Sequence, residues 1–273
     1  MTRIDRRALF ASGAAAALLT ATGASLADTP KSGGTLRLAV PRDDSLEQVA
    51  RGAVFDTLTE IAPDGTLRGE LATSWQTDAE ARVWRFDLRA DVLFHDGAAL
   101  TVQDVLAVLN EVGRAEALTI NQVRLELAEA NPGLPFLLAD NQFVITRDGQ
   151  GVTPLQAANG TGCYRVERAE DGRHFLGRKV VGHYKAGSAG WADAVEIIVI
   201  PDASVRAEAL RDGYVDVAAL PAADGLKGRR GVRYHPSESD MTLAMASHVG
   251  MPRHIGAARA LDDGRIAERW WLA

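Results

Sequence analysis

The chain has 273 residues, a formal net charge of −6 and a single cysteine. An acidic chain that lacks a basic run interleaved with aromatic residues argues against nucleic acid and against an anionic membrane surface as partners. The single cysteine, Cys163, excludes an internal disulfide, and we expect its thiol to be buried rather than reactive. The length favours two lobes over one core.

Residues 1–27 have the features of an export signal. Arg6 and Arg7 lie in a positively charged region, an apolar alanine-rich run extends over Ala8–Leu19, and residues 24–27 (ASLA) form a small-residue cleavage site. The arginine pair resembles a twin-arginine (Tat) signal, and an ordinary secretory peptide is the alternative. Without this leader the net charge is −8. No cysteine follows the cleavage site, so we expect a protein that is exported and not lipid-anchored.

The mature chain is expected to begin with a strand over residues 35–40 (TLRLAV), which Pro41 ends. A loop over Arg42–Leu46 follows, and then a helix that continues through Val49 and Val54.

Residues 70–112 predict strands, a turn and a helix. The apolar positions alternate with polar ones, which is typical of a strand with one buried face. These positions are Trp84, Phe86 and Leu88, followed by Val92 and Phe94. Asp96-Gly97 indicates a turn. Thr101 can then cap a helix, with Asp104 at the positive end of the helix dipole.

The following stretch is less regular. We expect a strand over residues 123–127, a short apolar turn over residues 134–138 and another strand over Phe143–Ile145. Thr153 and Pro154 are typical of a helix start.

Residues 195–216 predict a strand–helix–strand unit. The β-branched run at residues 195–200 indicates a buried strand. Asp202 can cap a helix over Ala203–Arg211, and a further strand begins at Asp216.

Six motifs of this sequence resemble those of the extracellular solute-binding proteins of the family that serves oligopeptide, dipeptide and nickel ABC importers. The matching motifs are Leu71-Ala72-Thr73-Ser74-Trp75, Trp84 to Arg89, Val92 to Gly97, Asp104-Val105, Gly160-Thr161-Gly162-Cys163-Tyr164, and the series Pro201, Asp202, Arg206, Leu210, Gly213 and Asp216. Cys163 stands where proline is usual in the family. The resemblance covers most of residues 33–220 and thins after Leu220, which predicts a C-terminally truncated member.

The resemblance implies an α/β fold: a mixed-sheet lobe like that of type II periplasmic binding proteins, a smaller α+β subdomain, and a second lobe that is largely missing. It assigns residues 33–62 and 151–220 to the main lobe and residues 63–150 to the inserted subdomain with the family signature. Residues 221–273 would then be a remnant of the second lobe, with a family-like segment around Arg259 and Arg265.

The resemblance further implies a periplasmic substrate-binding component of an ABC transporter of the peptide/nickel type. It would bind a small solute non-covalently and deliver it to a membrane permease, as a monomer, without a cofactor and without catalysis. The alternative is a truncated paralogue that no longer transports and acts as a periplasmic interaction or accessory module.

The family's loop positions give the candidate ligand-binding residues, which are Asp43, Asp44, Ser45, Cys163 and Tyr164. The two aspartates could meet a peptide amine or a metal, and a solvated acidic loop is the plainer interpretation. No metal site is predicted.

For the remaining histidines and for the terminal tryptophans, we favour structural roles. His95-Asp96 could be drawn as an acid–base pair, but it lies in a scaffold turn, so we expect a structural histidine. His248 and His254 could meet a metal, although scattered surface histidines are more common. We expect Trp270-Trp271 to fill a core rather than to form a partner-binding patch.

Overall fold

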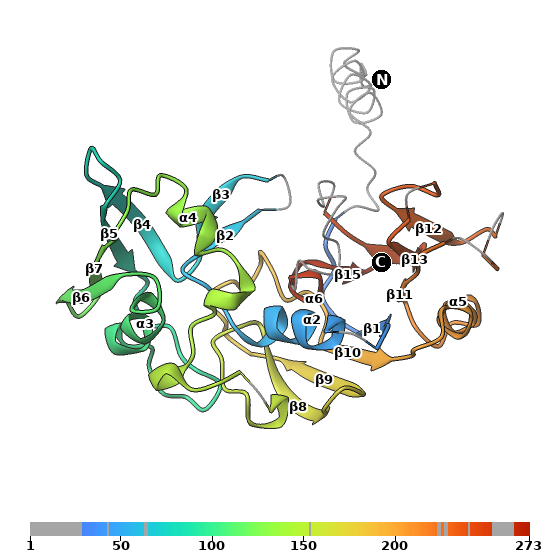
Figure 1. Ribbon diagram of the computed structural model, residues 1–273. Coiled ribbons are helices and arrows are strands. Elements are labelled where there is room, and N and C mark those ends of the chain that lie inside the picture. Colours follow the sequence, from blue (N-terminus) through green and yellow to red (C-terminus); the bar gives the residue numbers. More distant parts are fainter. Residues whose placement is uncertain are drawn as a thin grey trace, which may run out of the picture.

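The computed structural model describes residues 29–42, 44–62, 65–152, 154–222, 225–226, 229–239, 241–252 and 265–273. A seven-stranded sheet forms the larger part, in the order β12-β13-β11-β1-β10-β9-β8. Its strands are β1 (Thr35–Val40), β8 (Tyr164–Glu170), β9 (His174–Lys179), β10 (Ala194–Val199), β11 (Val217–Ala219), β12 (Val232–His235) and β13 (Leu243–Ala246). The sheet is at the right of Figure 1.

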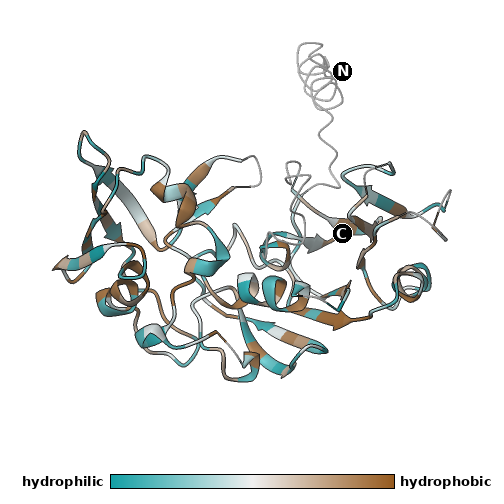
Figure 2. Ribbon diagram, in the orientation of Figure 1, coloured by the Kyte–Doolittle hydropathy of each residue, from teal (hydrophilic) through white to brown (hydrophobic). Residues whose placement is uncertain are grey.

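Strand β1 is central and makes the sheet mixed. It pairs in parallel with β10 on one side and with β11 on the other, whereas the remaining pairs are antiparallel. Leu36 is opposite Val195 and Leu38 is opposite Ile197 in this register. A parallel strand covered on both faces needs apolar side chains throughout, and Figure 2 shows β10 as one of the most hydrophobic strands.

Two helices cover the faces of this sheet. Helix α2 (Ser45–Val54) contacts β8, β9 and β10, and helix α5 (Ala203–Arg211) contacts β1, β11 and β13. Leu36 and Leu38 join the core that includes α2, whereas Ala39 belongs to the core under α5. Successive side chains of β1 point to opposite faces of the sheet, so this strand contributes apolar side chains to both cores. The predicted cap of α5 is confirmed, because the Asp202 side chain accepts hydrogen bonds from the backbone of Ser204 and Val205.

A second sheet forms a smaller α+β subdomain, at the left of Figure 1. Its order is β4-β5-β7-β6, with β4 (Ala72–Thr77), β5 (Val83–Leu88), β6 (Arg114–Thr119) and β7 (Gln122–Glu126). Trp84, Phe86 and Leu88 are buried, as their alternation predicts. Helix α3 (Val102–Leu109) packs on this sheet and begins with the expected cap: the Asp104 carboxylate accepts hydrogen bonds from both the backbone N–H and the hydroxyl of Thr101.

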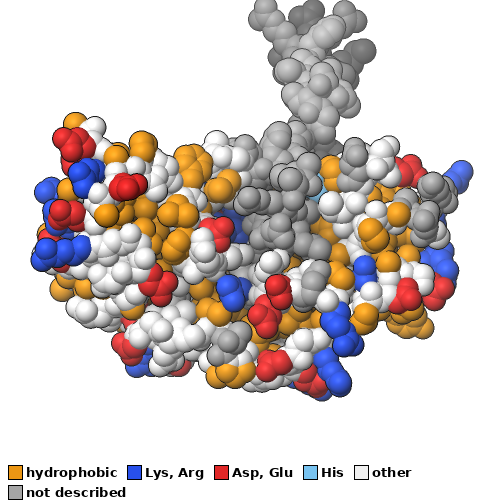
Figure 3. Space-filling view, viewed as in Figure 1, with side chains coloured by type: hydrophobic (Ala, Val, Ile, Leu, Met, Phe, Trp, Pro, Cys, Tyr) orange, Lys and Arg blue, Asp and Glu red, His pale blue; other side chains and the backbone are white. Residues whose placement is uncertain are grey.

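The outer edge of this subdomain is solvated. Figure 3 shows acidic and basic side chains interspersed there. Arg124, for example, forms ion pairs with Glu116 and Glu126 at 3.1 and 2.9 Å. Such exposed pairs contribute little to stability and mainly keep the edge polar.

Short elements connect the two parts. They are β2 (Thr59–Ile61), which pairs with β3 (Leu67–Gly69), helix α4 (Leu134–Leu137), and the 3-10 helices η2 (Asn141–Phe143), η3 (Arg147–Gly149) and η4 (Leu155–Ala157). The helix expected at Pro154 is thus only the short η4, and Thr153 lies outside the described residues.

Two strand predictions are wrong. Val92 and Phe94 do not lie in a strand, because the Phe94 N–H closes a tight turn onto the carbonyl of Ala98. The strand expected over Phe143–Ile145 is also absent: Val144 packs in the core under α2, whereas Ile145 packs in that of the subdomain. The alternation there reflects a segment that bridges two cores rather than a segment paired in a sheet.

The C-terminal part joins the same body. Strands β12 and β13 extend the seven-stranded sheet beyond β11, helix α6 (Ile266–Arg269) packs on α2, and β14 (Val249–Gly250) pairs with β15 (Trp271–Leu272). Trp270 and Trp271 are 1% and 4% exposed, which confirms that they fill a core. The predicted domain boundaries stay a prediction.

The Gly160–Gly162 loop is pressed against the end of α2. A Cβ atom at Gly160 would lie 2.0 Å from the carbonyl oxygen of Val54, and one at Gly162 would lie 2.6 Å from that of Ala53. The Gly162 N–H also donates to the Val54 carbonyl at 2.8 Å. These glycines are therefore required by close backbone approach.

We expect Gly160→Ala to lower the free energy of unfolding by ~2 kcal/mol or more, because backbone must move to admit the methyl group. Urea unfolding followed by circular dichroism measures the loss. Gly133→Ala is the control, since its Cβ would meet nothing closer than 3.4 Å. Equal stabilities for the two variants would contradict the packing argument.

Candidate functional site

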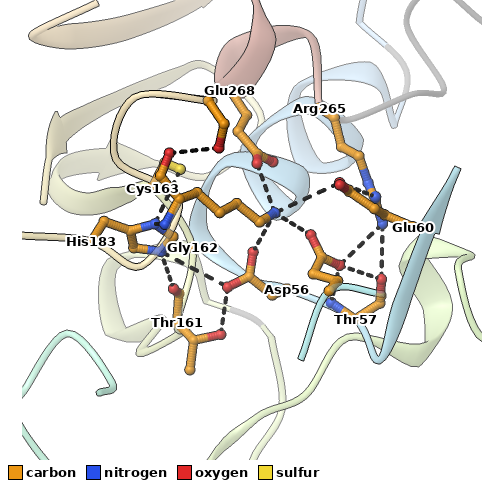
Figure 4. Close-up of polar contacts among 12 residues, drawn as sticks. Asp56, Thr57, Glu60, Thr161, Gly162, Cys163, His183, Arg265 and Glu268 are labelled. Atoms are coloured by element: carbon orange, nitrogen blue, oxygen red, sulfur yellow. Dashed lines mark hydrogen bonds and ion pairs between the residues drawn. The ribbon is translucent and has the colours of Figure 1, made fainter. Parts of the chain in front are cut away.

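Seven charged side chains form a buried group where the two sheets and the C-terminal helix meet (Figure 4). We call this group the ionic cluster; its members are Asp56, Glu60, Glu70, Lys185, Arg265, Glu268 and Arg269. Their exposed fractions lie between 1% and 9%. They come from the α2–β2 connection, β2, the β3–β4 connection, the β9–β10 connection and α6 with its preceding residue. The cluster therefore links the parts of the fold.

Lys185 is the centre of the cluster. Its Nζ lies 3.2 Å from Asp56 Oδ1 and 2.7 Å from Glu268 Oε1, and it also donates to Glu70 Oε1. Glu60 Oε2 is 3.7 Å away. Burial alone would lower the pKa of Lys185, but these carboxylates raise it well above its usual value. The ammonium therefore stays charged.

The arginines of the C-terminal segment bind the other side of the acidic group. Arg265 lies 2.8 Å from Glu60 Oε2 and 3.3 Å from Glu70 Oε2. It also donates to the Thr57 hydroxyl at 2.8 Å. Arg269 lies 3.4 Å from Glu60 and donates to the Ile61 carbonyl at 2.7 Å. A short helix is thus held by charge as well as by apolar packing.

Three of the carboxylates have the spacing of a metal site. One oxygen each of Asp56, Glu70 and Glu268 lies within 4.8 Å of the others. The Lys185 ammonium donates to all three, so an internal cation already lies between these oxygens. The arrangement therefore acts as a structural ion-pair network.

The pKa values of two carboxyls in the cluster move apart. Burial would raise the pKa of Glu70, but Arg265 and Lys185 outweigh it and lower that pKa to about 2. Burial raises the pKa of Glu268 to about 7; Lys185 opposes this, and the neighbouring carboxylates of Glu70, Glu60 and Asp56 add to it. The two glutamates are chemically identical, and their pKa values differ because Glu70 has cationic partners whereas Glu268 is close to other carboxylates.

A polar chain extends from the cluster to Cys163. The Thr161 hydroxyl donates to Asp56 Oδ2 at 2.9 Å, and His183 Nε2 lies 2.7 Å from the Thr161 carbonyl. His183 Nδ1 accepts the Lys185 backbone N–H at 3.1 Å, so the proton of the neutral ring is on Nε2. Burial lowers the pKa of His183, which favours this neutral form.

Cys163 is buried, as expected, and it is not an activated nucleophile. Its Sγ lies 3.5 Å from His183 Nδ1, but burial first, and then the nearby carboxylate of Glu268, raises the pKa of the thiol well above its usual value. Activated cysteines have the opposite environment. Cys163 and His183 are thus at hydrogen-bond distance, but their buried surroundings keep the thiol protonated.

The structure brings the predicted ligand residues together only in part. Asp44 is exposed at the start of α2, and Ser45 is the first, buried residue of that helix. Cys163 and Tyr164 are 3% and 0% exposed in the main core, where the Tyr164 hydroxyl donates to the Ala192 carbonyl at 3.2 Å. Asp43 lies outside the described residues. Their ligand-binding role stays a prediction.

His95 has a structural position. Its Nε2 lies 2.9 Å from the Gly162 carbonyl and its backbone N–H donates to the Gly160 carbonyl at 2.9 Å. Asp96 pairs with Arg147 instead of His95. His95 therefore fastens the glycine loop to the subdomain.

Neither of the two histidines considered as metal ligands belongs to a possible metal site among the described residues. His248 lies 2.9 Å from Asp216 Oδ1, and the Asp216 carboxylate also accepts the Arg37 backbone N–H. His254 lies outside the described residues.

Sequence reasoning missed the ionic cluster because its members are far apart in the chain. Glu60 and Arg265, for example, are separated by 205 positions. Each acid or base alone looks like an ordinary surface residue, and no local spacing connects them.

The family is decided by a match over most of the chain. A family model for bacterial extracellular solute-binding proteins, family 5, matches residues 66–246. The chain belongs to this family. The matched range includes the four-stranded subdomain and all strands of the seven-stranded sheet except β1. The mixed sheet with a smaller α+β subdomain is therefore the fold that the sequence predicts.

Two curated relatives are similar to parts of this chain. The chain is 25% identical over 198 residues to the nickel-binding periplasmic protein of Escherichia coli, covering 63% of this chain and 36% of the relative. It is 30% identical over 161 residues to the HTH-type transcriptional regulator SgrR of Pectobacterium atrosepticum, covering 55% and 28%. The chain thus spans about a third of the length of these curated relatives.

A solved structure shows the same fold. The periplasmic binding protein DppA of Helicobacter pylori, in complex with the peptide STSA, superimposes with a TM-score of 0.65 at 20% identity. The match covers 74% of this chain and 50% of DppA. Among the described residues, no helix combines the length and the apolar character needed to cross a membrane.

We expect Glu70→Gln to lower the free energy of unfolding at pH 7 by on the order of 3 kcal/mol, because Lys185, Arg265 and Thr57 all donate to this buried carboxylate and would lose a charged acceptor. The Glu70 contribution is fully present above its usual pKa of 4.5 and is lost as the pH falls towards about 2. The difference between the two proteins should therefore shrink on acidification. Urea unfolding at pH 7, 5 and 3 measures it.

Glu167→Gln is the matched control for that experiment. It removes an exposed carboxylate paired with Arg178, at 2.6 Å, and should change stability little at any pH. A Glu70→Gln deficit of the same size at all three pH values would contradict the linkage.

Cys163 should not react with a thiol reagent in the folded protein. With 5,5′-dithiobis(2-nitrobenzoic acid) at neutral pH, we expect negligible colour from native protein and one thiol per chain in denaturing guanidinium chloride, since the chain has a single cysteine. Rapid reaction without denaturant would contradict the assigned burial.

Proposed function

We propose that this protein is a periplasmic substrate-binding component of an ABC transporter of the peptide/nickel type. The observation that supports this most is the family match over residues 66–246, which includes both the subdomain and most of the main sheet. The named relatives add a nickel-binding periplasmic protein and a peptide-bound binding protein. The solute would be a peptide or a similar small molecule, and the receiving partner a membrane permease.

The mechanism is binding without bond chemistry. A solute that contacts two parts of a protein shifts the population towards the closed arrangement, and a permease recognises that arrangement. Within the described residues, the buried thiol of Cys163 and the neutral ring of His183 do not form an activated pair. We propose a non-enzymatic role, which the family match supports and with which this chemistry agrees.

The proposed solute site begins at the loop before α2. Asp44 is exposed there and could bind an amine or a metal ion, with Asp43 beside it in the sequence. Ser45 is buried at the start of α2, whereas Cys163 and Tyr164 are buried in the core and follow Gly162, which hydrogen-bonds to Val54 at the other end of that helix. The loop follows β1, the central strand of the sheet, so it is held at one end by a rigid element.

Export to the periplasm by the leader at residues 1–27, without a lipid anchor, is part of the proposal, as are the monomeric state and the division into a main lobe and an inserted subdomain. The leader lies outside the residues that the structure describes.

An interaction or accessory module is the second candidate. The relative from Pectobacterium atrosepticum is a transcriptional regulator, so members of this sequence group are not confined to transport. The chain also spans only half of the DppA structure. A site shared between two lobes encloses its ligand more fully than a site on one lobe.

Isothermal titration of the full chain with peptide pools and with Ni²⁺ distinguishes the two candidates. The transport proposal predicts a saturable heat for one of these probes, weakened at least about tenfold by Asp44→Ala. Glu208→Ala, an exposed acid on α5, is the control and should bind like the parent protein. No heat with any probe, combined with recovery of a soluble partner in a pulldown, would favour the accessory module.

A further inference from the structure

The ionic cluster contains more buried carboxylates than buried cations. Among the described residues, four acids (Asp56, Glu60, Glu70 and Glu268) meet three cations (Lys185, Arg265 and Arg269). Arg68 also pairs with Glu60, but its side chain is 52% exposed, so water screens its charge. An unpaired charge in a buried site is costly, and protonation of one carboxyl removes it.

The hydrogen bonds indicate which carboxyl takes the proton. Asp56 accepts from Lys185 and from the Thr161 hydroxyl. Glu70 accepts from Lys185, Arg265 and both the backbone and the hydroxyl of Thr57. Glu60 accepts from several arginines. The Glu268 carboxylate has one described donor, Lys185 at 2.7 Å, so it is the least stabilised anion of the four.

Glu268 lies in the C-terminal segment, residues 265–273, which packs against the main sheet's helix α2 and against β14. Helix α6 packs on α2, the adjacent Trp270 is 1% exposed in the main core, and β15 pairs with β14. The Glu268 backbone carbonyl also accepts the Gly190 N–H. A change in the charge of this side chain therefore acts directly on the attachment of residues 265–273.

We propose that Glu268 is a proton-dependent latch: in its neutral form it holds residues 265–273 on the main lobe, and its ionisation loosens that attachment. The direction of its pKa, raised by burial and by the neighbouring carboxylates, agrees with the charge count. The inference rests on the ionic cluster alone and does not depend on the proposed transport function.

Charged and titratable groups face Glu268 from every element packed around it. They are Lys185, Glu70, Glu60 and Asp56 of the cluster, together with Cys163, Tyr164 and Tyr184; His183 lies 4.0 Å from Asp56, and Arg265 and Arg269 belong to the same segment as Glu268. Of these, Glu70 has a lowered pKa and Cys163, Tyr184 and Lys185 have raised ones, so none of the four changes charge near neutrality. The lowered pKa of His183 moves its titration to more acidic pH.

The sign of the effect follows from linkage. A carboxyl with a folded pKa above its unfolded value of 4.5 contributes stability that is fully present below pH 4.5. This contribution is lost as the pH rises towards about 7 and does not change further above it. Stability should therefore decrease across this window because of Glu268.

The test compares the full chain with Glu268→Gln by urea unfolding from pH 5 to pH 8. Gln is a neutral stand-in for the protonated acid, so the unfolding constant of the parent relative to the variant should rise roughly tenfold or more across that range. A ratio of unfolding constants that does not change with pH would overturn the proposal. Such a constant ratio is what a purely structural role would give.

A local readout separates the latch from a general effect. Hydrogen exchange of peptides from residues 265–273, corrected for the intrinsic pH dependence, should show less protection at pH 8 than at pH 6 in the parent chain but not in Glu268→Gln. Glu208→Gln is the control and should match the parent. If Glu268→Gln fails to fold, Glu268→Met supplies a second neutral side chain. Equal pH dependence in parent and neutral variant contradicts the proposal.

Discussion

The fold depends on one buried ammonium group surrounded by carboxylates. Lys185 donates to Asp56, Glu70 and Glu268, and these acids come from three separate parts of the chain. Ion pairs at this depth gain little over apolar packing, because both charges must leave water. Their contribution is to specificity. A buried charge without its partners is strongly destabilising, so the cluster favours the single arrangement of the two sheets and α6 in which all its members are paired.

The central strand β1 gives this cluster a rigid base. It lies between β10 and β11, and the chain that leaves it forms α2 and then reaches Asp56. Gly160 and Gly162 bring a second connection against the end of α2, and His95 fastens that connection to the subdomain. The family motif around residues 92–97 and the Gly160 loop thus meet in space, which explains why both are needed for one scaffold.

Much of the scaffold is predictable from sequence because its signals are local. The strand at residues 35–40, the capped helices α3 and α5 and the burial of Trp84 and Phe86 all follow from periodicity and caps. The prediction at Phe143–Ile145 fails because apolar alternation cannot distinguish a strand from a segment between two cores. The ionic cluster is unpredictable for another reason: its partners are brought together by topology over separations as large as 209 residues.

The long reach of the cluster also sets an order of events in folding. Asp56, Glu60 and Glu70 are synthesised early, whereas the arginines and the glutamate of α6 follow only after about two hundred further residues. Until then, the three acids have Lys185 as their only buried cation among the cluster's members, so their burial would be costly. Contacts of such sequence separation slow folding. The ionic cluster can therefore be completed only after the C-terminal helix has been synthesised.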